Sequence, residues 1–576
     1  MGAELDKKVV AKTLRKVGVL LELAGENPFK ARAFDRAARA VESWGASFGE
    51  LTAAAAAGGV EGIGKGIAAD LAELAASGRL GVLDDLEASF PAGLTDLLDI
   101  SGLGPKTVRK LYEELDVTNI DALEAACRDG RIAKLPRMGE KSVANILAGV
   151  THLRSYSGRF HLHTALAAAR GIADALAPYA ERIEIAGSLR RRRETVKDID
   201  ILAATTDVAR LADAFTSLPG VTRVTGKGEA KCSVILDNGM ACDLRMVDAS
   251  VFGAALAHFT GSADHNVAMR RRAKSLGFKL SEYGLERDNG TRIPCPDERD
   301  VFEALGLAFI PPELREDLGE IVAAEAGDLP TLVEPAALRG VLHAHTQYSD
   351  GTASIADMAL AARDLGFAYL GLADHSQSST VAGGLKPDAV RRQHAEIDVF
   401  NAAHEFRVLK GIESDIRKDG SLDYDDDVLA SFDFVIASVH SHFQMSREDM
   451  TARVIRAASN PFTTMLGHPT GRLLLRREPY EIDMEAVVEA CAESGCAIEI
   501  NANPYRLDLD WRLVKKAIGL GVRIAICPDA HSTQQLAFSG FGVDIARKGW
   551  ARDVDVLNTL TADEFVAFAR SRRVGR

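Results

Sequence analysis

The sequence predicts a multidomain protein with a helical N-terminal region, a central α+β region and a C-terminal α/β region. Three observations predict this: amphipathic helical patterns up to about residue 150, strands on both sides of a carboxylate pair, and alternating β-α units beyond residue 336. A chain of 576 residues can hold about three to five domains. The expected segments are 1–82 and 83–154 (helical), 155–247 and 248–315 (central), 316–335 (linker) and 336–576 (C-terminal).

Composition describes an ordinary globular protein, with 47% hydrophobic and 26% charged residues. A net charge of −13 argues against indiscriminate coating of nucleic acid, although local basic patches remain compatible with DNA binding. The seven cysteines are scattered, as in a reducing cytosol. No stretch approaches the ~20 apolar residues of a membrane span. We therefore expect a cytoplasmic protein with no membrane partner.

Three stretches of the helical region, 61–68, 101–108 and 137–144, share a glycine turn followed by a helical pattern. Arg137 replaces the first glycine in the third stretch. A glycine turn at a helix start leaves backbone N–H groups free to bind a DNA phosphate without reading sequence. The repeats resemble helix-hairpin-helix motifs, and the residues expected to bind DNA there are Gly62, Gly64, Lys65, Gly102, Gly104 and Lys106.

The central region contains Asp198 and Asp200 on a predicted strand, where residues two apart project to the same face. Two carboxylates that close need a cation between them. Upstream, Gly187-Ser188 allows a phosphate to approach the backbone, and four arginines (190–193) add positive charge. The pattern predicts a Mg²⁺ or Mn²⁺ site for a nucleoside triphosphate, with Asp243 as third carboxylate. The alternative is a surface strand beside a solvated charge run.

The segment that follows narrows this interpretation. Phe259-Thr260-Gly261-Ser262, Asn266, Arg270 and Ser281-Glu282-Tyr283 occur in the order and spacing of a polymerase thumb. With the carboxylate motif, they resemble the palm and thumb of family-X, DNA polymerase beta-like enzymes. The resemblance implies catalytic carboxylates at Asp198, Asp200 and Asp243, nucleotide binding by Gly187, Ser188, Arg191, Phe259, Gly261 and Asn266, and DNA binding by Lys30, Arg245, Arg270 and Glu282.

The same resemblance bears on two side activities. Asp70 stands where relatives that remove a 5′-deoxyribose phosphate carry a Schiff-base lysine, so we do not expect that lyase route. His258 precedes Phe259 at the segment that senses the sugar 2′ position, and ribonucleotide discrimination is left open.

The C-terminal region alternates strands, such as 369–372, 434–437, 497–500 and 523–526, with helices, as in a parallel α/β barrel. Histidines and carboxylates follow these strands, and loops at the carboxyl ends of barrel strands meet on one face. Imidazole with carboxylate suits Zn²⁺ or Mn²⁺, and Glu413 could bridge two ions.

This region resembles the PHP (polymerase and histidinol phosphatase) domain, a distorted TIM-like barrel with up to three metals. The resemblance implies one ion held by His343, His345, Glu413 and Asp529. It implies a second ion that shares Glu413 with His440 and His468, and a third held by Asp350, His375 and His531. All nine positions carry a residue able to bind metal.

Together these features predict a bacterial family-X polymerase for gap-filling DNA repair, with metal-dependent 3′→5′ exonuclease and 3′-end processing in the barrel. Apurinic-site cleavage is left open. The expected partners are gapped or 3′-ended duplex DNA, bound without sequence preference, and deoxynucleoside triphosphates, with a monomer acting at the bacterial nucleoid. Two alternatives remain: a small-molecule nucleotidyltransferase fused to a phosphatase, and a catalytically silent DNA-end scaffold.

Overall fold

The computed structural model describes residues 7–44, 47–91, 93–100, 103–136 and 138–574. The chain forms two compact units, Met1–Ser157 and Gly158–Arg576. Gly102 of the second glycine motif and Arg137 of the third lie outside the described residues.

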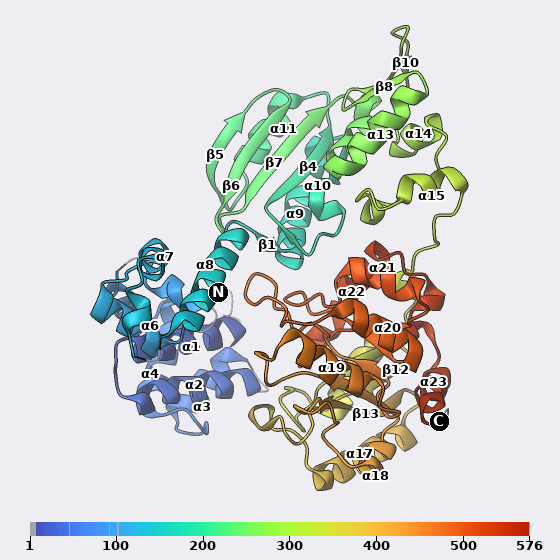
Figure 1. The fold of residues 1–576 in the computed structure, drawn as a ribbon. Coiled ribbons are helices and arrows are strands. Elements are labelled where there is room, and N and C mark those ends of the chain that lie inside the picture. The colour runs from blue at the N-terminus through green and yellow to red at the C-terminus, as the bar shows by residue number, and fades with distance from the viewer. Residues whose placement is uncertain (1–6, 45–46, 92, 101–102, 137, 575–576) are drawn as a thin grey trace. The chain divides into compact units, whose positions relative to one another are not determined.

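The first unit is helical, as expected (Figure 1). Asn27 caps the second helix through the Phe29 N–H, and Pro28 occupies its first position, where the missing N–H costs nothing. Two apolar cores hold the unit together, and the first helix contributes Leu21 to one and Leu20 to the other. The helices are α1 (Lys7–Leu23), α2 (Pro28–Ser43), α3 (Phe48–Ala56), α4 (Lys65–Ser77), α5 (Gly81–Ala88), α6 (Pro105–Leu115), α7 (Ile120–Arg128) and α8 (Glu140–Tyr156).

The second unit begins with a five-stranded sheet in the order β2-β4-β7-β6-β5, whose long strands are seen side by side in Figure 1. Residues of β4 pack on both sides of the sheet. Ile199 and Ile201 belong to the core that contains α9 and α11 residues, whereas Leu202 and Ala204 pack with Phe252 of α12. The elements are β1 (Phe160–His161), α9 (Leu162–Leu176), β2 (Arg182–Ile185), α10 (Gly187–Arg190), β3 (Thr195–Val196), β4 (Asp198–Ala204), α11 (Val208–Thr216), β5 (Val221–Lys227), β6 (Lys231–Leu236) and β7 (Ala241–Val247).

The thumb segment follows, with a core that includes Met269 and Phe302. Leu332, from the segment expected to be a linker, is buried in the same core, so this part of the chain is packed. The elements are α12 (Phe252–Thr260), α13 (Ala263–Ser275), β8 (Phe278–Ser281), β9 (Gly284–Arg287), β10 (Arg292–Ile293), α14 (Glu298–Ala304) and α15 (Glu320–Ala326).

The C-terminal region is a seven-stranded parallel sheet that nearly closes into a barrel, with strands paired in chain order from β11 to β17. A bridge between Ala344 and Ala530 joins the first strand to the segment after the last. The strands are β11 (Gly340–Ala344), β12 (Tyr369–Leu372), β13 (Arg407–Asp415), β14 (Phe434–Ser438), β15 (Met465–Leu466), β16 (Ala497–Asn501) and β17 (Ile524–Cys527).

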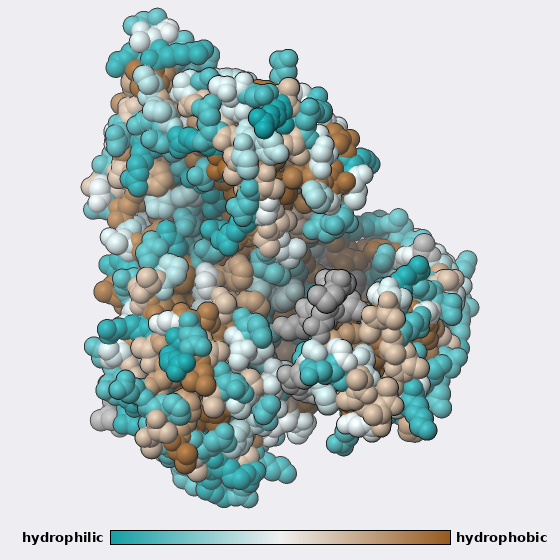
Figure 2. Space-filling model, turned by 180° about the vertical axis from the view of Figure 1, so that it is seen from behind, coloured by the Kyte–Doolittle hydropathy of each residue, from teal (hydrophilic) through white to brown (hydrophobic). Residues whose placement is uncertain are grey.

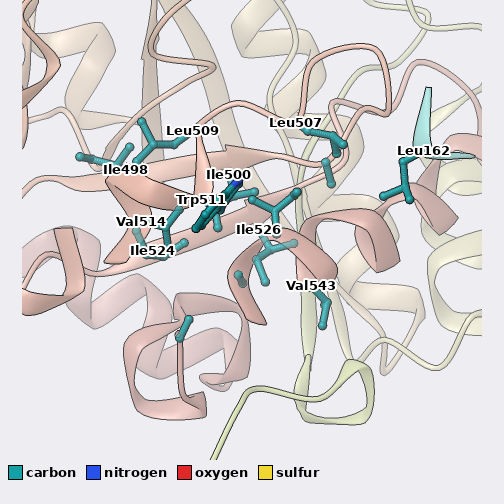
Figure 3. Packing of buried hydrophobic residues seen from close by; sticks show 14 of the residues in the cluster. Leu162, Ile498, Ile500, Leu507, Leu509, Trp511, Val514, Ile524, Ile526 and Val543 are labelled. Carbon is teal, nitrogen blue, oxygen red and sulfur yellow. The ribbon is translucent and has the colours of Figure 1, made fainter. Parts of the chain in front are cut away.

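Helices cover this barrel and connect its core to the palm. Figure 3 shows Ile526 of β17 and Val543 of α22 in one apolar cluster, to which Leu162 of α9 also belongs. The helices are α16 (Ile355–Asp364), α17 (Pro387–Ala403), α18 (Asp426–Ala430), α19 (Arg447–Ala458), α20 (Met484–Ser494), α21 (Trp511–Gly519), α22 (Ser539–Lys548) and α23 (Ala562–Val574).

On the face shown in Figure 2, apolar residues are interspersed with polar ones. Within the described ranges, none of the helices combines the length and the apolar character that a membrane crossing requires.

Candidate active sites in the palm and the barrel

The three expected carboxylates of the palm come together on two neighbouring strands. β4 and β7 run parallel, and their register places Asp200 opposite Asp243. Burial, followed by the charges of Asp198 and Asp243, raises the pKa of Asp200 to about 6. Mutual repulsion of this kind is relieved by a divalent cation, so the donor set fits Mg²⁺ or Mn²⁺.

Two further side chains contact this cluster that the sequence reasoning missed. Lys231 Nζ lies 2.6 Å from Asp243 Oδ2, and the Ser233 hydroxyl donates to Asp243 Oδ1 at 2.6 Å. Both lie on β6, whose register sets Ser233 beside Asp243. The alternating Lys231-Cys232-Ser233 pattern was the available signal, but only the strand order identifies the neighbour.

Gly187 lies against the Asp200 carboxylate. Its φ is +65°, and a Cβ there would lie 2.2 Å from Asp200 Oδ2. The adjacent Ala186 N–H donates to the Asp200 carbonyl at 2.8 Å. Glycine is therefore required at position 187 because the turn formed by residues 187–193 lies so close to Asp200. This requirement is separate from any approach of a phosphate to the turn.

The four arginines of the run are paired with carboxylates rather than solvated. Arg190 binds both oxygens of Glu298 (2.8 and 2.9 Å), and Arg191 Nε lies 3.2 Å from Glu316. Arg192 Nε lies 3.3 Å from Asp544, and Arg193 Nη1 lies 3.7 Å from Glu316. A solvated charge run does not describe this segment.

Glu298 is the most strongly held of these carboxylates. Burial opposes its ionisation, but Arg315 and Arg190 more than compensate and lower its pKa to about 2. Arg315 itself is fully buried and donates to Glu298 at 2.5 Å. The turn and the thumb are thereby joined through one ionised side chain.

Residues expected to bind nucleotide and DNA lie near this turn. The Arg191 guanidinium donates to the Thr260 carbonyl, and a Cβ on Gly261 would lie 2.9 Å from Arg191 Nη1. The Arg245 guanidinium lies 4.2 Å from the centre of the Phe259 ring. These contacts join the palm to the segment around residue 260.

His258 connects the remaining expected residues of the thumb. Asn266 Nδ2 donates to the His258 carbonyl at 2.7 Å, and Nδ1 of the His258 ring lies 4.0 Å from Glu282 Oε2. Burial, and to a smaller degree Arg270 and Arg245, lower the pKa of His258 although Glu282 raises it.

In the first unit, Gly64 and Gly104 are the N-cap residues of α4 and α6, and neither helix has a side-chain cap. The first backbone N–H groups of α4 are therefore available to a phosphate, and in α6, whose first residue Pro105 has no N–H, the Lys106 N–H is available. Gly62 precedes α4 with φ +87°. Lys65 and Lys106 lie in the first turns of these helices. Burial and then Glu73 raise the pKa of Asp70, which Lys30 opposes.

In the barrel, all nine expected ligands converge at the carboxyl ends of the strands. Ligand atoms lie within 4.8 Å of one another in three groups, and His468 Nε2 lies 2.9 Å from Glu413 Oε1. His345 and His375 were each expected in one ligand set, whereas in the structure each belongs to two groups. The groups are His343/His345/Asp529, His375/Glu413/His440 and His345/Asp350/His375/His531.

The donor atoms of this cluster fit metal ions. Among the described residues, His343 Nε2, His345 Nδ1 and Glu413 Oε2 are buried polar atoms that make no hydrogen bond. Buried polar atoms nearly always have a partner, and imidazole nitrogens with carboxylates are the ligands of Zn²⁺ and Mn²⁺.

A further layer of polar residues orients the ligands. Glu499 Oε2 lies 2.7 Å from His343 Nδ1, and Asp415 Oδ1 lies 2.5 Å from His440 Nδ1. Asn501 donates to Asp529 at 3.1 Å. Such partners fix the tautomer and orientation of a ligand. Glu499 was missed, although a lone glutamate in a buried strand was a signal.

Charges within the cluster are strongly coupled. Burial opposes protonation of His440, but Glu413 and Asp415 outweigh it and raise the pKa of His440 to about 10. Burial, aided by His531, lowers the pKa of His345 to about 3. A metal that binds His440 must therefore displace a proton.

Family models match most regions of the chain. The DNA polymerase beta thumb matches residues 255–316, and the PHP domain matches residues 342–503. A helix-hairpin-helix domain matches residues 6–80, and a SAM-like helix-hairpin-helix tandem matches residues 94–150. The expected fold class, with helical helix-hairpin-helix domains, a beta-like thumb and a PHP barrel, is confirmed.

Individual relatives agree with these matches. The chain is 40% identical over 572 residues to the DNA polymerase/3′-5′ exonuclease PolX of Bacillus subtilis, covering 98% of this chain and 100% of the relative. It is 27% identical to DNA polymerase lambda of Rattus norvegicus over 45% of this chain and 48% of the relative. A probable phosphatase of Caldanaerobacter subterraneus is 34% identical over 22% of this chain and 50% of its own length.

Proposed function

The chain belongs to the family-X DNA polymerases that carry a C-terminal PHP domain, and from this premise we propose that its palm fills gaps during DNA repair and its barrel trims 3′ ends. The observation that supports both activities is the presence of two separate ligand sets in one chain: three carboxylates in the palm, and in the barrel eight grouped ligands together with His468, which contacts Glu413.

In the palm, Asp198 and Asp200 would hold the ion that accompanies the nucleotide, and Asp243 would complete the site next to the primer 3′-OH. Mg²⁺ or Mn²⁺, when bound there, would offset the negative charge at the α-phosphate and would favour deprotonation of the attacking 3′-OH. Lys231, 2.6 Å from Asp243, would offset negative charge before the ions bind. Gly187, Ser188 and Arg191 would bind the triphosphate, while Phe259, Gly261 and Asn266 would position the sugar and base.

In the barrel, the nine ligands would hold up to three Zn²⁺ or Mn²⁺ ions, which supply an activated water for attack on a phosphodiester. Glu413 would bridge two ions, because its two oxygens contact different histidines: Oε1 lies 2.9 Å from His468 and Oε2 2.9 Å from His375. Arg506 Nε lies 3.6 Å from Asp529, where it can bind the phosphate of the DNA.

DNA is the substrate of this family, and gapped or 3′-ended duplexes are the form that we propose for this chain. Phosphates would be bound by backbone N–H groups at Gly62, Gly64, Gly102 and Gly104, together with Lys65 and Lys106. Lys30 would bind the 5′ side of a gap. The duplex near the palm would be bound by Arg245, Arg270 and Glu282. We propose a monomer at the nucleoid. A small-molecule nucleotidyltransferase does not fit the family, and a silent scaffold does not explain the two ligand sets.

Reciprocal variants test the assignment. Asp200→Asn should lower primer extension by about a hundredfold or more and leave 3′→5′ degradation unchanged, because it removes a charge from the palm alone. Glu413→Gln should abolish degradation, lower the metal content by elemental analysis, and leave extension unchanged. Loss of both activities in either variant, with the fold intact by circular dichroism, would contradict two independent centres.

A further inference from the structure

Lys548, the last residue of α22, is a fully buried lysine of the barrel whose ammonium group contacts the polymerase half of the chain. Its Nζ donates to Glu316 Oε1 (2.6 Å), to the Arg191 carbonyl (3.0 Å) and to the Glu313 carbonyl (3.2 Å). An ammonium group has three N–H donors, and each has an acceptor here. These bonds hold Lys548 and its partners in a fixed relation.

A second side chain of the same helix contacts the same part of the palm. Asp544 precedes Lys548 by four residues, so the two lie on one face of α22. Asp544 Oδ1 lies 3.3 Å from Arg192 Nε, and Arg192 adopts a left-handed backbone with φ +58°. Helix α22 therefore holds two consecutive palm residues, one by its carbonyl and one by its side chain.

Arg191 and Arg192 lie in the second half of the turn 187–193, which carries the proposed triphosphate-binding groups. Backbone bonds connect its two ends, since the Arg191 N–H donates to the Gly187 carbonyl (3.3 Å) and the Arg193 N–H to the Ser188 carbonyl (3.0 Å). Displacement of the Arg191 carbonyl would thus be transmitted to Gly187 and Ser188.

Glu316 connects Lys548 to the guanidinium of Arg191 as well. The same oxygen, Oε1, lies 2.6 Å from Lys548 Nζ and 3.2 Å from Arg191 Nε. Without Lys548, this carboxylate would be balanced only by arginines, and it would compete with a triphosphate for Arg191.

We propose that Lys548 and Asp544 are positioning residues for nucleotide binding, so that the barrel supports the polymerase site through α22 and independently of its own metal centre. The inference rests on the proposed function of Arg191 as a triphosphate ligand. It explains why a lysine is buried at this position, where an unpaired charge would be costly.

The test measures the dissociation constant of a deoxynucleoside triphosphate from full-length protein bound to gapped DNA with a dideoxy-terminated primer. Lys548→Met should weaken binding by about tenfold, the size of one charge-assisted hydrogen bond. Adding Glu316→Gln should restore binding to within about threefold, because a neutral side chain competes less for Arg191. A purely structural function of Lys548 predicts the reverse, with the double variant as weak as the single one or weaker.

Lys515→Met is the matched control, since Lys515 also reaches from the barrel to the segment after the thumb but donates to the Leu318 carbonyl (2.6 Å). It should leave binding unchanged. Retained 3′→5′ degradation shows that each variant is folded. If Lys548→Met is not folded, Asp544→Asn replaces it and should weaken binding by about threefold.

Unchanged nucleotide binding in the folded variant would overturn the inference. Arg191→Ala distinguishes the proposed function of Arg191 from the positioning function of Lys548. If Arg191→Ala binds the nucleotide normally, the proposed function of Arg191 is wrong; if it weakens binding while Lys548→Met does not, only the positioning function is wrong.

Discussion

Replacement of Gly187 by alanine should inactivate the polymerase while sparing the nuclease. The new Cβ would lie 2.2 Å from Asp200 Oδ2, whereas real Cβ contacts are not shorter than 3.0 Å. The carboxylate must therefore move by roughly 1 Å, and a misplacement of that size costs about a hundredfold in rate. Alanine at φ +65° adds about 1–2 kcal/mol of backbone strain.

The assay compares primer extension and 3′→5′ degradation in the same preparation. Gly226→Ala, on β5 of the same sheet, is the matched control, because a Cβ there meets only ordinary contacts with Ser233 at 3.8 Å. Its extension rate should equal that of the parent protein. Extension by Gly187→Ala within about threefold of the parent would refute the requirement for close approach to Asp200.

Two further outcomes concern DNA binding and stability. The Lys65→Ala/Lys106→Ala variant should flatten the log–log salt dependence of duplex binding by about 0.9 for each phosphate that is no longer neutralised, and an unchanged slope would remove both lysines from the interface. Glu298→Gln should be less stable at pH 7 by about 3 kcal/mol, from a pKa of about 2 against 4.5 when unfolded. Because the folded pKa is lowered, this stabilisation is present above pH 4.5 and decreases as the pH falls toward 2. Thermal unfolding from pH 7 to pH 3 should therefore show the two proteins converging; a constant difference would exclude Glu298 as the titrating group.

Local periodicity was sufficient to predict much of both sites. The strand period of two places Asp198 and Asp200 on one face, and the structure has them on β4 beside Asp243. In the barrel, parallel strands bring their carboxyl ends to one edge, so residues as distant as His343 and Asp529 could be expected to meet, and their side chains lie 3.7 Å apart. These inferences need only the type and order of the elements.

The sequence by itself therefore predicted the barrel and the residues able to bind metal from short-range patterns, and the class of the helical and thumb regions from their resemblance to known families. Only the tertiary structure decided the partners of the arginine run, because Glu298, Glu316 and Asp544 are more than a hundred residues away along the chain. Only the tertiary structure places Lys231 beside Asp243, because this contact depends on strand order. It also places the Lys548 ammonium group against the Arg191 carbonyl. A charge in a sequence does not specify its counter-charge; the packing of whole elements brings the two together and removes the water that would otherwise solvate them.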